Sequence, residues 1–311
     1  MRIRAVHDAT AASRHVITVL ARCCAAACVV LAMRMPALPA DGSKFVAQQK
    51  TFIRELFGQK RYFDVITETR RLMVFDPAGV KDYSFFIDIN YFLGGQYRSV
   101  IADITSGPAP ADFRNTILLS QAYLRLGMNE RGLETVMRIP YAAVDARYRY
   151  PLMARKAEAF MACGLYRELA GEIRAAGEFV PDGRVRVLGE EVGRYGRVPF
   201  KSVPLAVALS VVVPGAGQIY AGKWLQGVVS FIGIASLAGG AYLFHRQGSR
   251  DLSYVLIAFS SVMYIGNIYG AYNAAQKTNE DLERNFRNDV QKKCIPPYDP
   301  AEEVRDNRAI R

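Results

Sequence analysis

The stretch LQGVVSFIGIASLAGGAYLF, residues 225–244, carries no charged side chain. At about 1.5 Å per residue, a helix of this length crosses the roughly 30 Å hydrocarbon layer of a bilayer. The stretch LSYVLIAFSSVMYIGNIYGAY, residues 252–272, is uncharged in the same way. We therefore expect two membrane spans. The alternative is a buried helical hairpin in a soluble protein, which the complete lack of charge disfavours.

The loop between the two stretches, HRQGSRD at residues 245–251, is so short that it predicts a tight antiparallel hairpin. Arg246 and Arg250 outnumber Asp251 in this loop. Loops rich in Arg and Lys stay on the cytoplasmic side of a membrane. The sequence therefore predicts a protein of the bacterial inner membrane with this loop in the cytoplasm. The domain before the hairpin and the tail after it are then expected in the periplasm.

Small residues recur every four positions in the second span and would form a smooth ridge on one helix face. Such ridges let two helix backbones approach closely in a membrane. We expect this ridge to pack against the first span, or in a homodimer against a second copy. The polar residues Ser260, Ser261 and Asn267 are expected to face a helix rather than lipid. The predicted helix-packing residues are Ser236 and Gly240, or Ala235 and Gly239, on the first span and Gly266, Gly270 and Ala274 on the second.

An apolar run from Val203 to Val213 precedes the hairpin and is too short to span a bilayer. Pro214 comes directly after it and lacks the amide proton that a continuing helix requires. We expect a short re-entrant or interfacial helix here. The alternative is one kinked helix from Val203 to Tyr220 that crosses the membrane and reverses the topology of the two spans after it.

Two motifs mark the start of the first span and the end of the second, PGAGQIYAGKWLQG at residues 214–227 and GNIYGAYNAA at residues 266–275. Together they resemble a family of small bacterial membrane domains that are distantly similar to TM2-type two-span domains. The chain differs from the TM2 type in having Asn267 near the place of its usual aspartate. The resemblance implies a fold and a location, not a reaction. Its candidate residues are Pro214, Gly215, Gly217, Gln218, Tyr220, Gly222 and Lys223 in the first motif, and Gly266, Asn267, Tyr269, Gly270, Tyr272 and Asn273 in the second.

Residues 1–40 are typical of an export signal, because a basic start is followed by an apolar middle and a small-residue end. Cleavage is predicted after Ala40. Arg22 interrupts the apolar run, so an uncleaved N-terminal anchor is an alternative. A lipoprotein-type cleavage before Cys28 is a second alternative.

Residues 41–198 are polar and show no strand alternation and no nucleotide-binding loop. Four helix-turn glycines, each followed by a proline, recur with spacings of 36, 33 and 37 residues. A helix, glycine turn, helix and proline with a period near 34 looks like tetratricopeptide (TPR) repeats. An ordinary helical bundle is the alternative. Stacked hairpins form a groove that receives a protein partner. The glycines are Gly58, Gly94, Gly127 and Gly164, and the prolines are Pro77, Pro108, Pro140 and Pro181.

The fold class expected for the whole chain is therefore all-α, a TPR-like domain followed by a membrane domain at residues 199–276. Residues 277–311 are expected to form a polar helix, with Leu282, Phe286 and Val290 as a narrow apolar stripe, and a disordered tail. Cys294 lies in this polar region and could form an intermolecular bridge, whereas Cys163 is expected to be a core residue.

The chain has a net charge of +11, and residues 41–201 carry 24 Lys and Arg against 19 Asp and Glu. Much of this excess lies just before the membrane domain, which indicates contact with lipid headgroups rather than nucleic acid, for which no motif is present. His245 is the only one of three histidines outside the predicted signal. We find no nucleophile motif or metal-ligand spacing, so we expect neither an enzyme nor a cofactor. The sequence predicts a protein-binding scaffold in envelope organisation or biogenesis. The alternative is an accessory subunit of a membrane transport or channel assembly.

Overall fold

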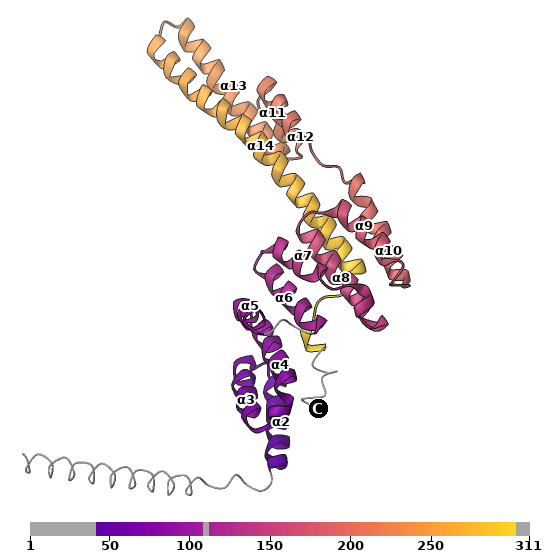
Figure 1. Cartoon of the computed structure of the whole chain (residues 1–311). Coiled ribbons are helices and arrows are strands. Elements are labelled where there is room, and N and C mark those ends of the chain that lie inside the picture. The colour runs from indigo at the N-terminus through magenta and orange to yellow at the C-terminus, as the bar shows by residue number, and fades with distance from the viewer. Residues whose placement is uncertain (1–41, 108–111, 303–311) are drawn as a thin grey trace, which may run out of the picture. The chain divides into compact units, whose positions relative to one another are not determined.

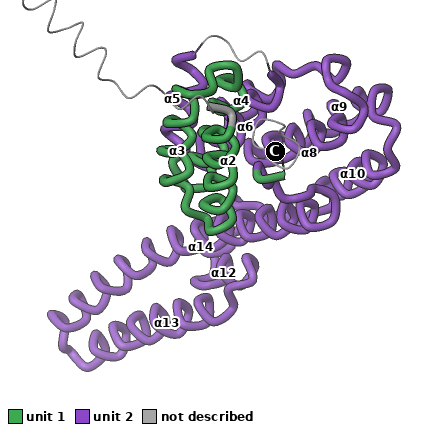
Figure 2. The backbone as a smooth tube through the Cα atoms, turned by 90° about the horizontal axis from the view of Figure 1, so that it is seen from below, with its two compact units in different colours: residues 1–96, 301–311 green, residues 97–300 purple. Residues whose placement is uncertain are grey.

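The computed structural model describes residues 42–107 and 112–302, and every regular element in these ranges is helical (Figure 1). The chain divides into two compact units, one of residues 1–96 with 301–311 and one of residues 97–300 (Figure 2). The predicted export signal, Pro108 and the end of the predicted tail lie outside the described residues.

In the described part of the first unit, residues 42–96, three helices pack together, α2 (Gly42–Gly58), α3 (Tyr62–Phe75) and α4 (Val80–Leu93), with a 3₁₀ turn, η1 (Pro77–Gly79), before α4. Apolar side chains from all three helices form its core, including Ile53, Leu72 and Phe86. Pro77 follows the end of α3, as the repeat pattern predicts.

The second unit begins with six helices, of which consecutive members pack against each other. Gly127 and Gly164 stand in the turns α6–α7 and α8–α9 with φ of +74° and +72°. Only glycine adopts this left-handed conformation without a steric cost. Two other predicted glycines are displaced by a residue or two, because Lys60 and Gly95, not Gly58 and Gly94, take positive φ. The helices are α5 (Tyr97–Ser106), α6 (Phe113–Arg125), α7 (Asn129–Met137), α8 (Ala146–Ala162), α9 (Tyr166–Ala176) and α10 (Gly183–Gly193).

Two long apolar helices, α13 (Trp224–Arg246) and α14 (Arg250–Cys294), pack as a pair (Figure 1). Both are long and apolar enough to cross a membrane. Within their most apolar windows only 17% and 11% of the residues are buried, so most of the apolar surface faces outward. A core hairpin of a soluble protein would have most of this surface covered.

A short helix, α11 (Val203–Val212), precedes the pair and ends where Val213 becomes extended, before Pro214. Gly215 is left-handed, with φ of +86°, and reverses the chain into α12 (Ala216–Tyr220). The two helices are therefore separate, and a single kinked helix from Val203 to Tyr220 is not formed.

Helix α14 does not end with the predicted span but continues unbroken to Cys294. The predicted polar helix is thus the second half of α14 rather than a separate element. Val290 and Cys294 join the core that α6 to α10 form, and Phe286 packs against that core. Cys294 is only 6% exposed, which corrects its placement in a solvated tail and leaves it inaccessible for an intermolecular bridge. Cys163 is half-buried at the end of α8.

Candidate functional site

The two sequence motifs meet in a buried polar network between α11, α12 and α14. The side-chain oxygen of Asn267 accepts hydrogen bonds from the backbone N–H of Gly215 at 2.8 Å and from the side-chain amide of Gln218 at 3.0 Å. The Asn267 amide donates to the carbonyl of Ser210 at 3.3 Å. The Ser210 hydroxyl donates to Gln218 at 3.0 Å and accepts from the N–H of Gly217 at 3.0 Å. We call these five residues the motif network.

The motif network is closed to solvent, because Ser210, Gln218 and Asn267 are 0%, 2% and 5% exposed. A buried polar group without a partner costs about 1–3 kcal/mol, so such groups require hydrogen bonds. Each of these three side chains has its partners inside the network. The network therefore holds α11 and α12 in one position against α14.

Two glycines of the first motif allow this close approach. A Cβ on Gly215 would lie 2.0 Å from the carbonyl oxygen of Gly227, and one on Gly217 would lie 1.9 Å from that of Ala206. No side chain fits at such distances. The Pro-Gly-x-Gly-Gln pattern is thus explained by backbone packing together with the polar contacts of Gln218.

The rest of the first motif forms a turn that is attached to α14 farther along. The Tyr220 hydroxyl accepts from the N–H of Ser202 at 3.0 Å, and Gly222 is left-handed with φ of +83°. The N–H of Lys223 donates to the carbonyl of Gln218 at 2.8 Å and closes the turn. From α14, the Thr278 hydroxyl donates to the carbonyl of Ala221 at 2.9 Å.

A second attachment joins α14 to the segment that leads into α11. The Asn279 side chain accepts from the N–H of Lys201 at 2.7 Å and donates to the carbonyl of Lys201 at 2.9 Å. One amide thereby pairs with both backbone groups of one residue. The start of the membrane domain is fixed to α14 at this point.

The remaining candidates of the second motif lie outside the network. Gly266 and Asn273 are exposed, and Tyr269 is 66% exposed. The rings of Tyr269 and Tyr272 stack with centroids 6.3 Å apart, and the Tyr272 hydroxyl accepts from Gln276 at 2.8 Å. Pro214 is half-buried at the turn.

The predicted ridge does not form the contact between the two long helices. Ser236 is exposed, and a Cβ on Gly270 would face the Gln218 amide at 3.1 Å rather than α13. Ala274 packs with α11 and α12 in a small alanine cluster. Gly270 and Ala274 of α14 instead contact α12 and α11, where small residues let the helices approach closely, and Gly266 contacts neither. Gly240 does face α14, with Leu256 at 3.5 Å from its Cβ position.

Several residues of the site were missed by the sequence reasoning. Ser210 is the single polar residue of the apolar run from Val203 to Val213. A lone polar residue in such a run indicates a buried hydrogen bond, so this position could have been found from the sequence. Thr278 and Asn279 lie just beyond the uncharged stretch and carried no motif. Of the flagged serines, Ser261 is exposed and donates to the carbonyl of Ile257 in its own helix at 2.9 Å.

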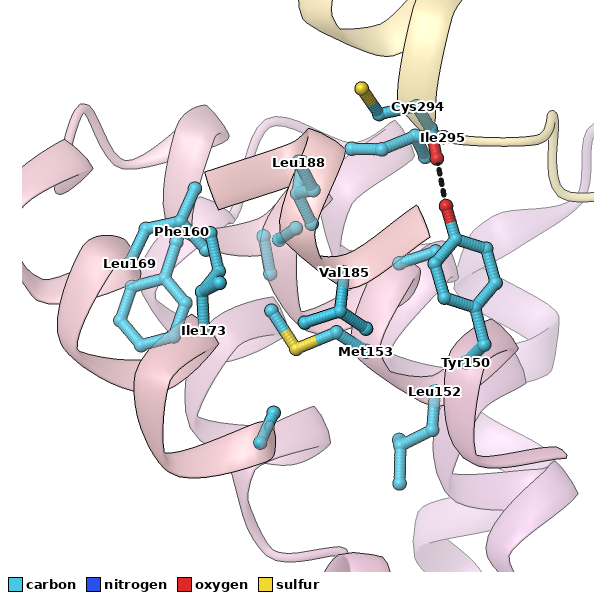
Figure 3. Close-up of a cluster of buried hydrophobic side chains, with 14 of the residues drawn as sticks. Tyr150, Leu152, Met153, Phe160, Leu169, Ile173, Val185, Leu188, Cys294 and Ile295 are labelled. Carbon is cyan, nitrogen blue, oxygen red and sulfur yellow. Dashed lines mark hydrogen bonds between the residues drawn. The ribbon is translucent and has the colours of Figure 1, made fainter. Parts of the chain in front are cut away.

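A second candidate site lies where the end of α14 meets α8, α9 and α10 (Figure 3). The Phe286 ring meets the rings of Tyr166 and Tyr195 with centroids 5.6 and 5.3 Å away. The Tyr150 hydroxyl donates to the carbonyl of Cys294, as the dashed line in Figure 3 marks. Lys293 lies 3.5 Å from the carboxylate of Glu191 in α10.

Burial changes the acidity of the groups at this second site. It raises the pKa of the Tyr150 and Cys294 side chains, because the charged form of each would lose water. It lowers the pKa of the buried Arg155 guanidinium for the same reason, while Glu158 opposes the shift. The residues that the structure describes contain no cluster of three His, Cys, Asp or Glu side chains that could hold a metal ion.

In the residues that the structure describes, these features define an all-helical protein. Its packed apolar helix pair, α13 and α14, is continuous with the helices α5 to α10, which we call the helical domain. Comparisons of the chain with protein-family models, curated proteins and solved structures found no match.

Proposed function

We propose that this chain is an integral protein of the bacterial inner membrane that holds a TPR-like domain at the periplasmic surface as a protein-binding scaffold. The observation that carries the proposal is the continuity of α14. Its first half has outward apolar surface, and one face of its second half packs into the core of the helical domain through Phe286, Val290 and Cys294. Helix α14 has 45 residues. At about 1.5 Å per residue it is longer than a bilayer is thick, so its second half lies outside the membrane. A partner bound to the helical domain is thereby held near the membrane.

The TPR-like interpretation of the helical domain is supported by its turns. Antiparallel neighbours are joined at Gly127 and Gly164, and Pro140 follows the end of α7. Hairpins of this kind stack to cover a shared core, and their exposed faces bind other proteins. Between α5, α6 and α7 a surface cavity of about 590 Å³ is lined by residues that include Leu119, Tyr123 and Arg138. We assign this cavity as a candidate partner site.

The orientation rests on the loop between the long helices. Arg246 and Arg250 are exposed there, and loops with such cations remain in the cytoplasm. The resemblance of the motif region to TM2-type domains also supports a membrane location for this part of the chain.

Cysteine labelling tests the location and the orientation together. In a chain whose five cysteines are replaced, Gln247→Cys reports on the loop and Asn288→Cys on the far half of α14. Both positions are exposed. An impermeant maleimide added to spheroplasts is expected to label Asn288→Cys, and to label Gln247→Cys only after lysis. Recovery of the chain in the soluble fraction after alkaline carbonate would contradict the proposal, and so would labelling of the loop in intact spheroplasts.

A photoreactive amino acid at Tyr123 tests the scaffold role. It is expected to crosslink one envelope protein reproducibly, whereas the same amino acid at the exposed Arg186 in α10 is the control. Equal crosslinking patterns from the two positions would count against a partner at the α5–α7 cavity.

A role as an accessory subunit of a transport or channel assembly is the second candidate, and one observation favours it. A groove of about 680 Å³ runs between α13 and α14, lined by small and aromatic residues that include Ala238, Tyr254 and Ser261. Such a groove accepts a helix of another subunit or of a second copy. Disulfide crosslinking of Ser261→Cys in membranes is expected to give dimers in that case, and a monomer after mild detergent extraction would contradict it.

A further inference from the structure

The chain leaves α14 at Ile295 and runs in an extended form along α8 as the segment 295–299, within the second unit. Two prolines, Pro296 and Pro297, keep it extended, because proline restricts φ and cannot continue a helix. We call residues 296–299, which come before a helical turn that begins at Pro300, the proline segment.

Side chains of α8 bind backbone carbonyls of this segment and one of its rings. Tyr150 donates to the carbonyl of Cys294 just before the segment, and Arg155 donates to the carbonyl of Pro296. The Arg155 guanidinium also lies over the ring of Tyr298, 5.7 Å from its centroid. Backbone carbonyls together with one aromatic ring are features that many extended peptides share, so the contacts select a conformation and a ring rather than one sequence.

Contacts within α6 and α8 also hold the receiving side chain of Arg155. With the segment in place, Tyr150 and Arg155 are each 4% exposed. Arg155 is paired with Glu158 at 2.8 Å, and Gln121 of α6 donates to the same carboxylate at 3.1 Å. A fixed donor set loses little conformational freedom on binding, which favours recognition of a ligand.

The proline segment itself is held less completely. Pro296 and Pro297 are exposed and Tyr298 is half-buried, whereas Ile295 before them and Pro300 after them are buried. A cavity of about 470 Å³ lies beside it, lined by residues that include Arg184, Val187 and Pro297. The surface is therefore wider than the segment that covers it, and the middle of the segment is accessible from one side.

We propose that this face of α8 is a peptide-binding site for an extended, proline-containing segment with an aromatic residue, and that the chain's own proline segment occupies it in cis. A partner protein with such a segment exchanges with it. This proposal adds a ligand class to the proposed scaffold function. It rests on that function for the statement that the ligand belongs to a partner protein. A tethered segment competes at an effective concentration in the millimolar range, so the full-length chain binds a free peptide much more weakly than a chain without the segment does.

The test measures binding of a fluorescent, acetylated peptide with the sequence IPPYDPAE, residues 295–302, to the detergent-solubilised chain. A variant that ends at Ile295 retains the core residues Val290, Cys294 and Ile295 and lacks the proline segment and the residues after it. It is expected to bind the peptide at least about tenfold more tightly than the full-length chain. In the shortened chain, Arg155→Met is expected to remove this gain, whereas Arg147→Met in the same helix is the matched control. Arg147 lies over Tyr148 and is exposed.

If Arg155→Met lowers the yield of folded protein, the same contact is tested from the side of the peptide. Tyr298→Ala in the peptide is expected to weaken its binding to the shortened chain as well. Equal affinity of the full-length and shortened chains would overturn the proposal. So would the absence of binding to a shortened chain that unfolds cooperatively. Membrane fractionation distinguishes failure of this proposal from failure of the proposed membrane scaffold. A chain that stays in the membrane but fails to bind the peptide refutes only the exchange of the proline segment with a partner's segment.

Discussion

At the scale of single residues, the two motifs differ in how much space surrounds their glycines. Gly217 is enclosed by the backbone of α11 and by Ala271, whereas a Cβ on Gly266 would meet nothing within 4 Å. Both glycines belong to similar small-residue patterns in the sequence. Only the contacts separate a glycine that the packing requires from one that it does not.

Replacement of Gly217 by alanine is expected to be strongly destabilising. The new methyl group would lie 1.9 Å from the Ala206 carbonyl oxygen and 2.7 Å from the Ala271 Cβ, so the backbone must move and the motif network must open. We expect a loss of about 2–4 kcal/mol, measured by denaturant unfolding in detergent micelles. Gly266→Ala is the matched control, and it is expected to stabilise α14 by up to about 1 kcal/mol. Equal effects of the two substitutions would refute this account of the motif.

Asn267→Ala tests the polar half of the network. It leaves the N–H of Gly215 without its acceptor in a closed site, which costs about 1–3 kcal/mol, whereas the Gln218 amide loses one acceptor and keeps the backbone carbonyl at position 267. Ser261→Ala removes a hydroxyl that bonds only within its own exposed helix turn, and its effect is expected to stay within about 0.5 kcal/mol. The same unfolding measurement compares them, and an Asn267→Ala chain as stable as the control would contradict the role given to the network.

At the scale of elements, α14 connects the apolar helix pair with the helical domain. The apolar stripe that contains Phe286 and Val290, from which the sequence predicts only a weakly amphipathic helix, is a packing face. Val290 is 1% exposed, and the Phe286 ring touches two tyrosines. A narrow stripe is sufficient here because α8, α9 and α10 cover just one side of α14.

Loss of the Phe286 ring is expected to loosen this contact by about 1.5 kcal/mol, which corresponds to about a tenfold larger open population. The reporter is Cys294 as the single cysteine, because its thiol is buried and reacts with a maleimide only after the site opens. Phe286→Ala is expected to speed labelling about tenfold, and Asn285→Ala at the exposed neighbouring position is the control. Unchanged labelling in Phe286→Ala would show that the ring does not hold α14 in place.

The same reporter gives a pH dependence. Burial raises the pKa of the Cys294 thiol, so it stays protonated at a pH where a free thiol, with a pKa of about 8.5, is already the reactive thiolate. The labelling rate of Cys294 is therefore expected to rise at a higher pH than that of Gln247→Cys in the exposed loop. Superimposable pH profiles for the two cysteines would contradict the burial of Cys294.

At the scale of the whole molecule, the orientation that we propose for the membrane domain rests on few charges. Reversal of both loop cations, in Arg246→Glu with Arg250→Glu, removes the positive bias from which we infer that the loop stays inside. We expect a fraction of the chains to invert, so that Gln247→Cys becomes labelled in intact spheroplasts. Lys292→Glu, at an exposed position in the far half of α14, is the control and is expected to leave the loop protected. A loop that remains fully protected after charge reversal would show that other features set the topology.

The sequence reached a large part of the architecture because the relevant signals are local. Apolar length identified α13 and the first half of α14, and Pro214 marked the end of the short helix before them. Gly127 and Gly164 marked turns because they require positive φ. The sequence reasoning did not find Ser210 or Asn279, because a hydrogen bond to a distant backbone group leaves no periodic pattern.

By itself, the sequence determined the helical character of the chain, the extent of its uncharged stretches and the turns that glycine and proline impose. These properties depend on neighbouring residues and on helix length. Only the tertiary structure decided which faces meet. Asn267 bonds Gly215 across 52 residues of chain, and Tyr150 bonds Cys294 across 144. The physical reason is that a helix face can be calculated from local spacing, whereas its partner depends on the simultaneous packing and hydrogen bonding of segments that are remote in the chain.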